Sequence, residues 1–122
     1  ITPQRIAVYE ALVEFYHPTA DDIYKKVLEK IPGLSYTTVY NILDTLVTNK
    51  LISRVKTDAD VMRYDAITEH HHHLYCASSD RMEDYYDPEL DQLLKEHFKR
   101  KQPHGFTITD IRLQLMGDFT KE

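Results

Sequence analysis

The order of helix and strand signals in the first half of the chain most constrains its fold. Three stretches with apolar residues at helical spacing come first, and each follows a residue that can cap a helix: Thr2, Thr19 and Ser35. Proline or glycine ends the first two stretches, at His17-Pro18 and Pro32-Gly33. The side chains expected in the core are Ile6, Tyr9, Val13 and Tyr16 in the first helix, Ile23, Val27 and Ile31 in the second, and Val39, Ile42, Leu43, Leu46 and Val47 in the third.

Two β-prone stretches, residues 51–57 and 61–67, follow the third helix and are joined by Asp58-Ala59-Asp60. Three short helices and then a hairpin make the order of elements of a winged helix-turn-helix domain, here residues 1–66. In that arrangement the last helix lies in the major groove of DNA and the hairpin rests on the phosphate backbone. The first half therefore predicts a DNA-binding domain, and a helix bundle with an ordinary polar face is the structural alternative.

The polar face of the third helix carries the residues expected to contact DNA. Asn41 can form two hydrogen bonds with adenine, and Thr37 and Tyr40 can reach bases or phosphates. Asp44 lies on the same face, where phosphates repel its carboxylate, and we expect it at the margin of the groove. The remaining phosphate contacts are expected from Gln4, Arg5, Tyr36, Arg54 and Lys56.

The second half, residues 67–122, predicts a small α/β domain. Strands are expected at 72–77 and 81–86, followed by a helix that begins at Asp87-Pro88 and a long strand from Phe106 to Met116. A three-stranded antiparallel sheet with one helix is small for independent stability. We expect it to bury its other face against a second copy, which predicts a homodimer. The predicted fold class is α+β, a winged helix followed by a dimerisation domain.

Four of the seven histidines form an unbroken run, residues 70–73, where the first of these strands begins. Successive strand side chains point to opposite faces, so His71 and His73 share one face and the other two share the opposite face. Two imidazoles two residues apart can reach one metal ion. Asp65 before the run and Asp84 after it can supply carboxylates. The run predicts a metal site, and a solvated polar strand end is the alternative.

Charge and composition favour a soluble cytoplasmic protein. The net charge of −5 argues against a nucleic-acid partner if taken alone. The acidity is concentrated in one half, because residues 1–66 carry 8 basic against 9 acidic side chains and residues 67–122 carry 7 against 11. The sequence contains no signal peptide and no apolar stretch near the roughly 20 residues of a membrane span. A single cysteine excludes an internal disulfide and fits a reducing compartment.

Motifs in both halves together resemble the ferric uptake regulator (Fur) family of bacterial metal-dependent repressors. They are Thr2-Pro3-Gln4-Arg5, His17-Pro18-Thr19-Ala20-Asp21-Asp22-Ile23-Tyr24, Thr38-Val39-Tyr40-Asn41, Arg63-Tyr64-Asp65 and the histidine run that ends in Cys76. The resemblance covers essentially the whole chain in register. It implies a winged helix joined near Ile67 to a dimerisation domain, a double-stranded DNA operator as partner, and an N-terminal helix of which part precedes the sequence given.

The resemblance also implies a regulatory metal site made of His17, Asp65, His71, His73 and Asp84. Three imidazoles and two carboxylates suit Fe(II) or Mn(II), and Zn(II) in vitro. Family members that resemble peroxide sensors carry Asp at the position of Asp84, which favours that PerR-like branch. A metal bonded to both halves would fix the angle between them and so the spacing of the DNA-binding helices in a dimer. For this branch the resemblance implies that bound Fe(II) reacts with peroxide and oxidises a coordinating histidine, with His17 and His71 as the candidates.

The chain departs from the family pattern at its cysteines. Most members hold a structural zinc with two Cys-x-x-Cys pairs, whereas here Cys76 stands alone and Ser79 occupies the position of its partner. We interpret Cys76 as a small buried residue. The alternative is a thiol that senses redox state or ligates haem.

A second metal site, seen in some relatives, is implied at His70, His72 and Asp91. The histidine expected as its last ligand falls on Ile111, so the site is incomplete. These residues are therefore a weaker prediction than the regulatory site.

Three hypotheses follow for the function. The first is a homodimeric, metal-dependent DNA-binding repressor that responds to peroxide or redox stress. The second is an iron-, haem- or thiol-responsive regulator on the same scaffold that uses Cys76. The third is a small metalloenzyme. No carboxylate is evidently placed as a general base beside an open metal position, and the chain is short for a substrate pocket. We therefore expect neither an enzyme nor a small-molecule substrate.

Overall fold

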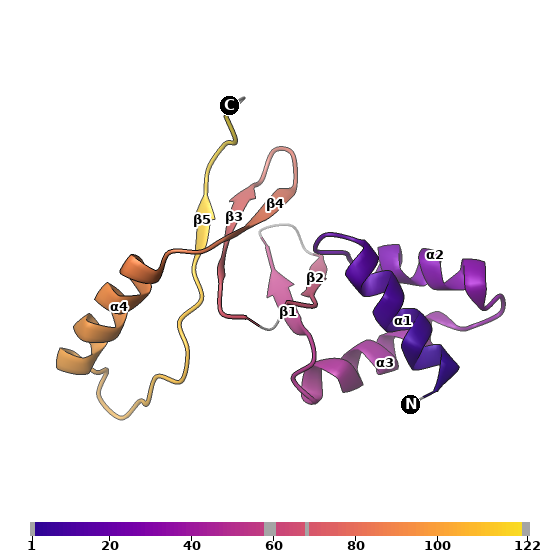
Figure 1. Ribbon diagram of the computed structural model, residues 1–122, viewed down its shortest axis with the longest axis horizontal. Helices are drawn as coiled ribbons and strands as arrows, with labels where there is room; N and C mark the ends of the chain where they lie inside the picture. Colours follow the sequence, from indigo (N-terminus) through magenta and orange to yellow (C-terminus); the bar gives the residue numbers. More distant parts are fainter. Residues whose placement is uncertain (1, 58–60, 68, 121–122) are drawn as a thin grey trace. The chain divides into compact units, whose positions relative to one another are not determined.

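The computed structural model describes residues 2–57, 61–67 and 69–120. The chain forms two compact units, Ile1–Glu69 with three helices and two strands and His70–Glu122 with one helix and three strands (Figure 1). Within the described residues, none of the helices combines the length and the apolar character that crossing a membrane requires.

The first unit consists of three helices followed by a hairpin, the predicted order (Figure 1). Its elements are α1 (Pro3–Glu14), α2 (Ala20–Lys30), α3 (Tyr36–Thr48), β1 (Ser53–Lys56) and β2 (Met62–Asp65). The two strands pair antiparallel, with Ser53 opposite Asp65, and both are shorter than predicted. The predicted connection Asp58-Ala59-Asp60 lies outside the described residues.

All three helices begin at the predicted caps. The side chains of Thr2, Thr19 and Ser35 each accept the backbone N–H three residues further on, at 3.1 Å. At α2 the bond is reciprocal, because the Asp22 carboxylate accepts the N–H of Thr19 at 3.0 Å. Such a capping box satisfies two donors that the first turn of a helix leaves without intrahelical partners.

The core of the first unit uses the predicted faces of α2 and α3 but a different face of α1. The buried side chains are Ala20, Ile23 and Val27 in α2 and Val39, Ile42, Leu43 and Leu46 in α3. In α1 they are Ala7, Val8, Ala11 and Leu12, whereas the predicted Ile6, Tyr9, Val13 and Tyr16 are 40% to 57% exposed. Apolar residues surround most of α1, so spacing alone does not select its buried face. The small side chains of Ala7 and Ala11 let α1 approach its neighbours closely.

The second unit is a three-stranded sheet with one helix, and its sheet is mixed rather than antiparallel. Its elements are β3 (His72–Cys76), β4 (Arg81–Tyr85), α4 (Pro88–Arg100) and β5 (Gln114–Met116), with strand order β4-β3-β5. β4 pairs with β3 antiparallel and β5 pairs with β3 parallel. The prediction of an all-antiparallel sheet was therefore wrong. Two parallel strands need a long connection, which α4 and the segment after it provide.

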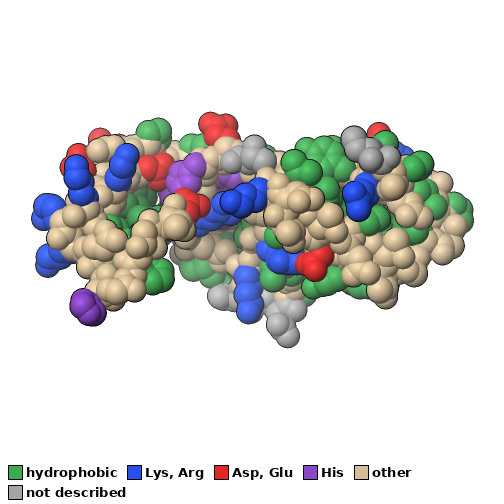
Figure 2. Space-filling view, turned by 90° about the horizontal axis from the view of Figure 1, so that it is seen from below, with side chains coloured by type: hydrophobic (Ala, Val, Ile, Leu, Met, Phe, Trp, Pro, Cys, Tyr) green, Lys and Arg blue, Asp and Glu red, His purple; other side chains and the backbone are tan. Residues whose placement is uncertain are grey.

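The predicted long strand from Phe106 to Met116 is also wrong, because only its last three residues pair with β3. The preceding segment instead follows α4, where Ile108 and Ile111 line a hollow of about 400 Å³ together with Leu94 and Phe98. None of the described residues of α4 is fully buried. Basic side chains gather over the end of this helix (Figure 2).

Asp87 caps α4 as predicted. Its carboxylate accepts the N–H of Leu90 at 2.9 Å and the hydroxyl of Tyr85 at 2.7 Å. These two hydrogen bonds favour the charged form and hold the pKa of Asp87 below its ordinary value. The cap thereby ties the end of β4 to the start of the helix.

The two valines of α1 test its unexpected orientation. Val8 is fully buried and Val13 is 53% exposed. Val8→Ala should lower the free energy of unfolding by about 1.5–3 kcal/mol, because it removes buried methyl groups and leaves a cavity. Val13→Ala should change it by less than about 0.5 kcal/mol. Urea denaturation measures both, and helix propensity changes equally in the two variants. Equal losses would contradict the observed face.

Candidate metal centre

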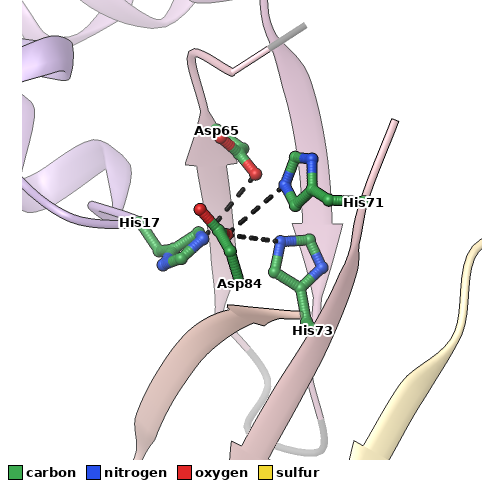
Figure 3. A group of neighbouring side chains, drawn as sticks. All are labelled: His17, Asp65, His71, His73 and Asp84. Carbon is green, nitrogen blue, oxygen red and sulfur yellow. Dashed lines mark ion pairs between the residues drawn. The ribbon is translucent and has the colours of Figure 1, made fainter. Parts of the chain in front are cut away.

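Within the first unit, His17 lies beside Asp65, the last residue of β2 (Figure 3). The His17 Nε2 and Asp65 Oδ2 atoms are 3.6 Å apart, and both side chains are buried. The other carboxylate oxygen of Asp65 accepts the N–H of Ile67 at 2.9 Å, which fixes the orientation of the carboxylate. His17 and Asp65 also line one hollow of about 240 Å³.

Backbone contacts with β2 hold His17 in this position. His17 follows α1 and has φ 53°, in the left-handed region that few side chains adopt. The carbonyl of Pro18 accepts the N–H of Tyr64 at 2.8 Å, and Thr19 forms a bridge with Arg63. The Arg63 guanidinium donates to the carbonyl of His17 at 2.7 Å. The loop is therefore attached to the strand that carries Asp65.

Within the second unit, His71 and His73 lie on the predicted common face, with ring centroids 4.8 Å apart. Asp84 of β4 is directly opposite His73 in the strand register. The Nε2 atoms of His71 and His73 are 3.4 Å and 3.6 Å from the same oxygen, Oδ1 of Asp84 (Figure 3). Two imidazole nitrogens thus converge on one carboxylate oxygen.

The chemistry of both groups fits a divalent metal. The nitrogen–oxygen separations of 3.4 Å to 3.6 Å exceed the roughly 2.7–2.9 Å of a short charge-assisted bond. Two ligands about 2.1 Å from one ion and about 90–110° apart lie about 3.0–3.4 Å from each other. Imidazole nitrogen and carboxylate oxygen suit Fe(II), Mn(II) and Zn(II). Taken by itself, the first unit offers two such ligands and the second unit offers three.

The opposite face of β3 carries a second cluster. The ligand atoms of His70, His72 and Asp91 all lie within 4.8 Å of one another. His70 Nδ1 also lies 3.3 Å from Oδ1 of Asp110, a neighbour that sequence reasoning missed. The one sequence feature that pointed to Asp110 is its neighbour Ile111, the position where the last histidine ligand of this site was expected. Burial raises the pKa of Asp110, but hydrogen bonds from Arg112 and the Ile111 N–H outweigh burial and lower it.

The hydrogen bonds of His72 oppose metal binding at this second cluster. The ring is fully buried, and its Nδ1 accepts the N–H of Leu113 at 3.0 Å. An accepting Nδ1 places the proton on Nε2, which lies 2.5 Å from Oδ1 of Asp91 and donates to it. A metal on Nε2 would have to displace that proton. As arranged here, His72 connects β3 to α4 and to the segment before β5.

Cys76 is buried and belongs to a small hydrogen-bonded group. Its sulfur lies 3.2 Å from the Ser78 hydroxyl and 3.5 Å from Oδ1 of Asp118. Hydrogen bonds from Ser78 and then Ser79 hold the pKa of the Cys76 thiol below its ordinary value, although burial acts in the opposite direction. The interpretation as a buried residue agrees with this position, and the redox or haem role of Cys76 stays a prediction.

The chain segment after β5 is held to the sheet by further contacts. The N–H of Gly117 donates to the carbonyl of Tyr75 at 3.0 Å. The guanidinium of Arg81 lies 4.1 Å from the ring centre of Phe119. Together with Cys76 and Asp118, these side chains attach the tail to β3 and β4 without thiolate ligands.

The residues predicted to contact DNA are exposed side chains of the first unit. Tyr36, Thr37, Tyr40 and Asn41 are all exposed on α3. Burial, followed by Asp21, raises the pKa of Tyr36. Arg5 of α1 and Lys56 of β1 are exposed as well, whereas the guanidinium of Arg54 is bonded to the carboxylate of Asp44.

The chain resembles curated bacterial regulators along nearly its whole length. It is 37% identical over 120 residues to the peroxide operon regulator of Bacillus subtilis (strain 168), covering 96% of this chain and 79% of that protein. It is 31% identical over 120 residues to the peroxide-responsive repressor PerR of Staphylococcus epidermidis, covering 96% and 77%.

Solved structures agree in fold. The peroxide stress regulator of Campylobacter jejuni superimposes with a TM-score of 0.82 at 26% identity, over 98% of this chain and 88% of that one. The Helicobacter pylori ferric uptake regulator Fur, whose structure is described as having three functional metal-binding sites, also gives 0.82 at 26% identity, over 93% and 77%. The model of the ferric uptake regulator family matches residues 1–116, from α1 through β5. Both units are included in that match, and the chain belongs to the ferric uptake regulator family, as its motifs predicted.

Proposed function

We propose that the protein is a metal-dependent, DNA-binding transcriptional repressor that acts as a homodimer in the cytoplasm and responds to peroxide. The observation that carries this proposal is the division of the ligands. His17 and Asp65 form a pair in the first unit, and His71, His73 and Asp84 form a group in the second. The relatives are regulators by name, and we propose no enzymatic activity.

A single ion shared by both groups would complete its coordination only when the two units adopt one relative orientation. Three imidazoles and two carboxylates suit Fe(II) or Mn(II), with Zn(II) as an in vitro substitute. The contacts between the His17 loop and β2 keep the first pair rigid, so metal binding acts on the connection between the units. Without metal, the orientation that binds DNA becomes a minor state of the ensemble.

The DNA-binding surface of this proposal is the exposed face of α3. Asn41, Tyr40 and Thr37 contact bases, while Tyr36, Arg5 and Lys56 contact phosphates. In a homodimer two such helices read two half-sites of a double-stranded operator, and their spacing depends on the angle between the units of each chain. The sheet and α4 of residues 67–122 provide the dimer contact.

The peroxide response rests on the names of the relatives and on the ligand set. When bound, Fe(II) supplies the reducing power that activates peroxide next to the histidines. With iron held there, one oxygen atom of peroxide would replace the hydrogen on a ring carbon of His17 or His71, and the other would leave as water. An oxidised ring is a poorer ligand, so the two units lose their connection and the operator is released.

The cluster of His70, His72 and Asp91 is proposed as a secondary, weaker metal site. Its three ligand atoms are close together, but the Nε2 proton of His72 competes with the metal. Occupation would therefore require a higher metal concentration than the first site.

Substitution of one ligand from each unit tests the shared ion. His17→Ala and His71→Ala should each weaken Mn(II) binding by at least about 10- to 100-fold, since even partners outside the coordination sphere cost that much. Calorimetric titration measures the affinity, and His97→Ala on α4 serves as the control. If His17→Ala keeps the wild-type affinity, the second unit binds the ion alone and the shared site is refuted.

Two asparagines of the same helical region test the DNA-binding face. Asn41→Ala should weaken binding to a duplex selected by the Mn(II)-loaded protein by about 10- to 100-fold, because a bidentate base contact is worth about 1–3 kcal/mol. Asn49→Ala, one residue beyond α3 on the border of the same hollow, should weaken it less than Asn41→Ala. Fluorescence anisotropy measures both. If Asn41→Ala lowered the Mn(II) affinity to the same extent, the proposed separation of the DNA-binding face of α3 from the metal site would be contradicted.

A peroxide pulse tests the signal. After anaerobic loading with Fe(II), peptides that contain His17 or His71 should gain the mass of one oxygen, and operator binding should fall. With Mn(II) in place of Fe(II), neither change is expected. Mass spectrometry of the digested protein decides the outcome, and unmodified histidines with iron bound would argue for a different signal.

A further inference from the structure

The hairpin β1–β2 forms the wing of the first unit. One ion pair joins it to α3, the helix proposed to bind DNA. The guanidinium of Arg54, on β1, is hydrogen-bonded to the carboxylate of Asp44, on α3. Both side chains remain partly exposed, with 35% and 54% of their surface accessible. The pair therefore lies at the surface, where a duplex can approach it.

The strand register explains why Arg54 turns toward α3. Arg54 is directly opposite Tyr64 in the hairpin, and cross-strand partners project from the same face of a sheet. Tyr64 is fully buried in the core of the helices. Burial raises the pKa of the Tyr64 phenol, and the nearby Arg54 guanidinium partly offsets that rise. Arg54 therefore extends along the face of the hairpin that meets the helices, rather than outward from the wing.

Asp44 continues the row of residues proposed to contact bases. Thr37, Tyr40, Asn41 and Asp44 are spaced at i, i+3, i+4 and i+7, and all four are exposed on α3. In the sequence of this helix Asp44 is the only charged residue. Asn41 and Asp44 also line one shallow hollow with Thr45, Thr48 and Asn49. The carboxylate, and the guanidinium that it binds, thus lie next to the proposed base contacts.

A carboxylate at this place has two physical effects on DNA binding. Phosphates repel it, which weakens binding to any duplex that offers no compensating contact. It also holds the guanidinium in a fixed orientation, and a fixed guanidinium matches the O6 and N7 acceptors of guanine in the major groove. An isolated arginine on a wing would bind phosphate without regard to sequence.

We infer that Asp44 and Arg54 determine sequence specificity together: Arg54 contacts a guanine edge, and Asp44 is the positioning residue that directs it there and disfavours other sequences. The inference rests on the proposed binding of DNA through α3. It replaces the sequence-based expectation that Arg54 is a phosphate contact and gives a role to Asp44, which had none.

The test compares binding to two duplexes by the full-length, Mn(II)-loaded chain. One duplex is selected from a random-sequence library by the wild-type protein, and the other has the same composition in scrambled order. Asp44→Asn should strengthen binding to the scrambled duplex about 3- to 10-fold and reduce the ratio of the two affinities about 10-fold. It should also steepen the salt dependence by about one phosphate contact. Asp44→Glu, which keeps the charge, should restore most of the ratio.

Arg54 variants separate the two effects. Arg54→Gln should weaken the selected duplex about 10- to 100-fold and the scrambled duplex much less. In that background, Asp44→Asn should no longer change the ratio, because the guanidinium that it positions is absent. Unchanged Mn(II) affinity and melting temperature confirm that each variant is folded.

Three results would overturn the inference. The first is that Asp44→Asn leaves the ratio of the two duplex affinities unchanged. The second is that Asp44→Asn lowers this ratio equally in the wild-type and in the Arg54→Gln background. The third is that Arg54→Gln weakens binding to both duplexes by the same factor. Failure of the underlying function is distinguishable. If Asn41→Ala also leaves the selected duplex tightly bound, α3 does not contact the bases. If Asn41→Ala weakens binding, only the role of Asp44 and Arg54 is rejected.

Discussion

The hydrogen bonds between the His17–Thr19 loop and β2 are the constraint on which the first unit depends. They join the end of α1 to the hairpin, and the Tyr64 N–H, the Arg63 guanidinium and the bridge at Thr19 all take part. The connection of α1 to the hairpin and the position of the His17 side chain thus have one structural cause. A loop held only at its ends would leave His17 many conformations, and ordering them would reduce the affinity for any ion.

The second unit achieves the same preorganisation with a strand pair. Antiparallel pairing puts Asp84 opposite His73, and the two-residue period brings His71 to the same side. The alternate histidines face the other way, toward Asp91 and Asp110. The side chains of this run of four histidines therefore lie in two different environments. One of them resembles a ligand group and the other is a hydrogen-bonded connection between β3 and α4.

Local chemistry made much of this architecture predictable. The caps of all four helices, the buried faces of α2 and α3 and the two faces of the histidine run follow from short-range rules of backbone bonding and periodicity. The buried face of α1 does not, because apolar residues surround that helix and packing with its neighbours decides the outcome. The parallel pairing of β5 likewise depends on the path of residues 101–113, where alternation from residue 107 onward suggested a strand that only residues 114–116 form. The contacts of Asp110 with His70 and of Asp44 with Arg54 join separate elements, so spacing within one element could not reveal them.

The chain segment after β5 is attached to the sheet by contacts that differ in their sensitivity to oxidants. Its attachments are the Gly117 hydrogen bond, the Cys76–Asp118 contact and the Arg81–Phe119 stacking. A zinc ion held by four thiolates would be sensitive to oxidants and to chelators. Loss of such an ion loosens the chain segments that it joins. Among these attachments the Cys76 thiol can be oxidised, whereas guanidinium, aromatic ring and backbone amide resist both treatments. Mild oxidants should therefore leave the Gly117 and Arg81–Phe119 attachments in place even where they modify Cys76.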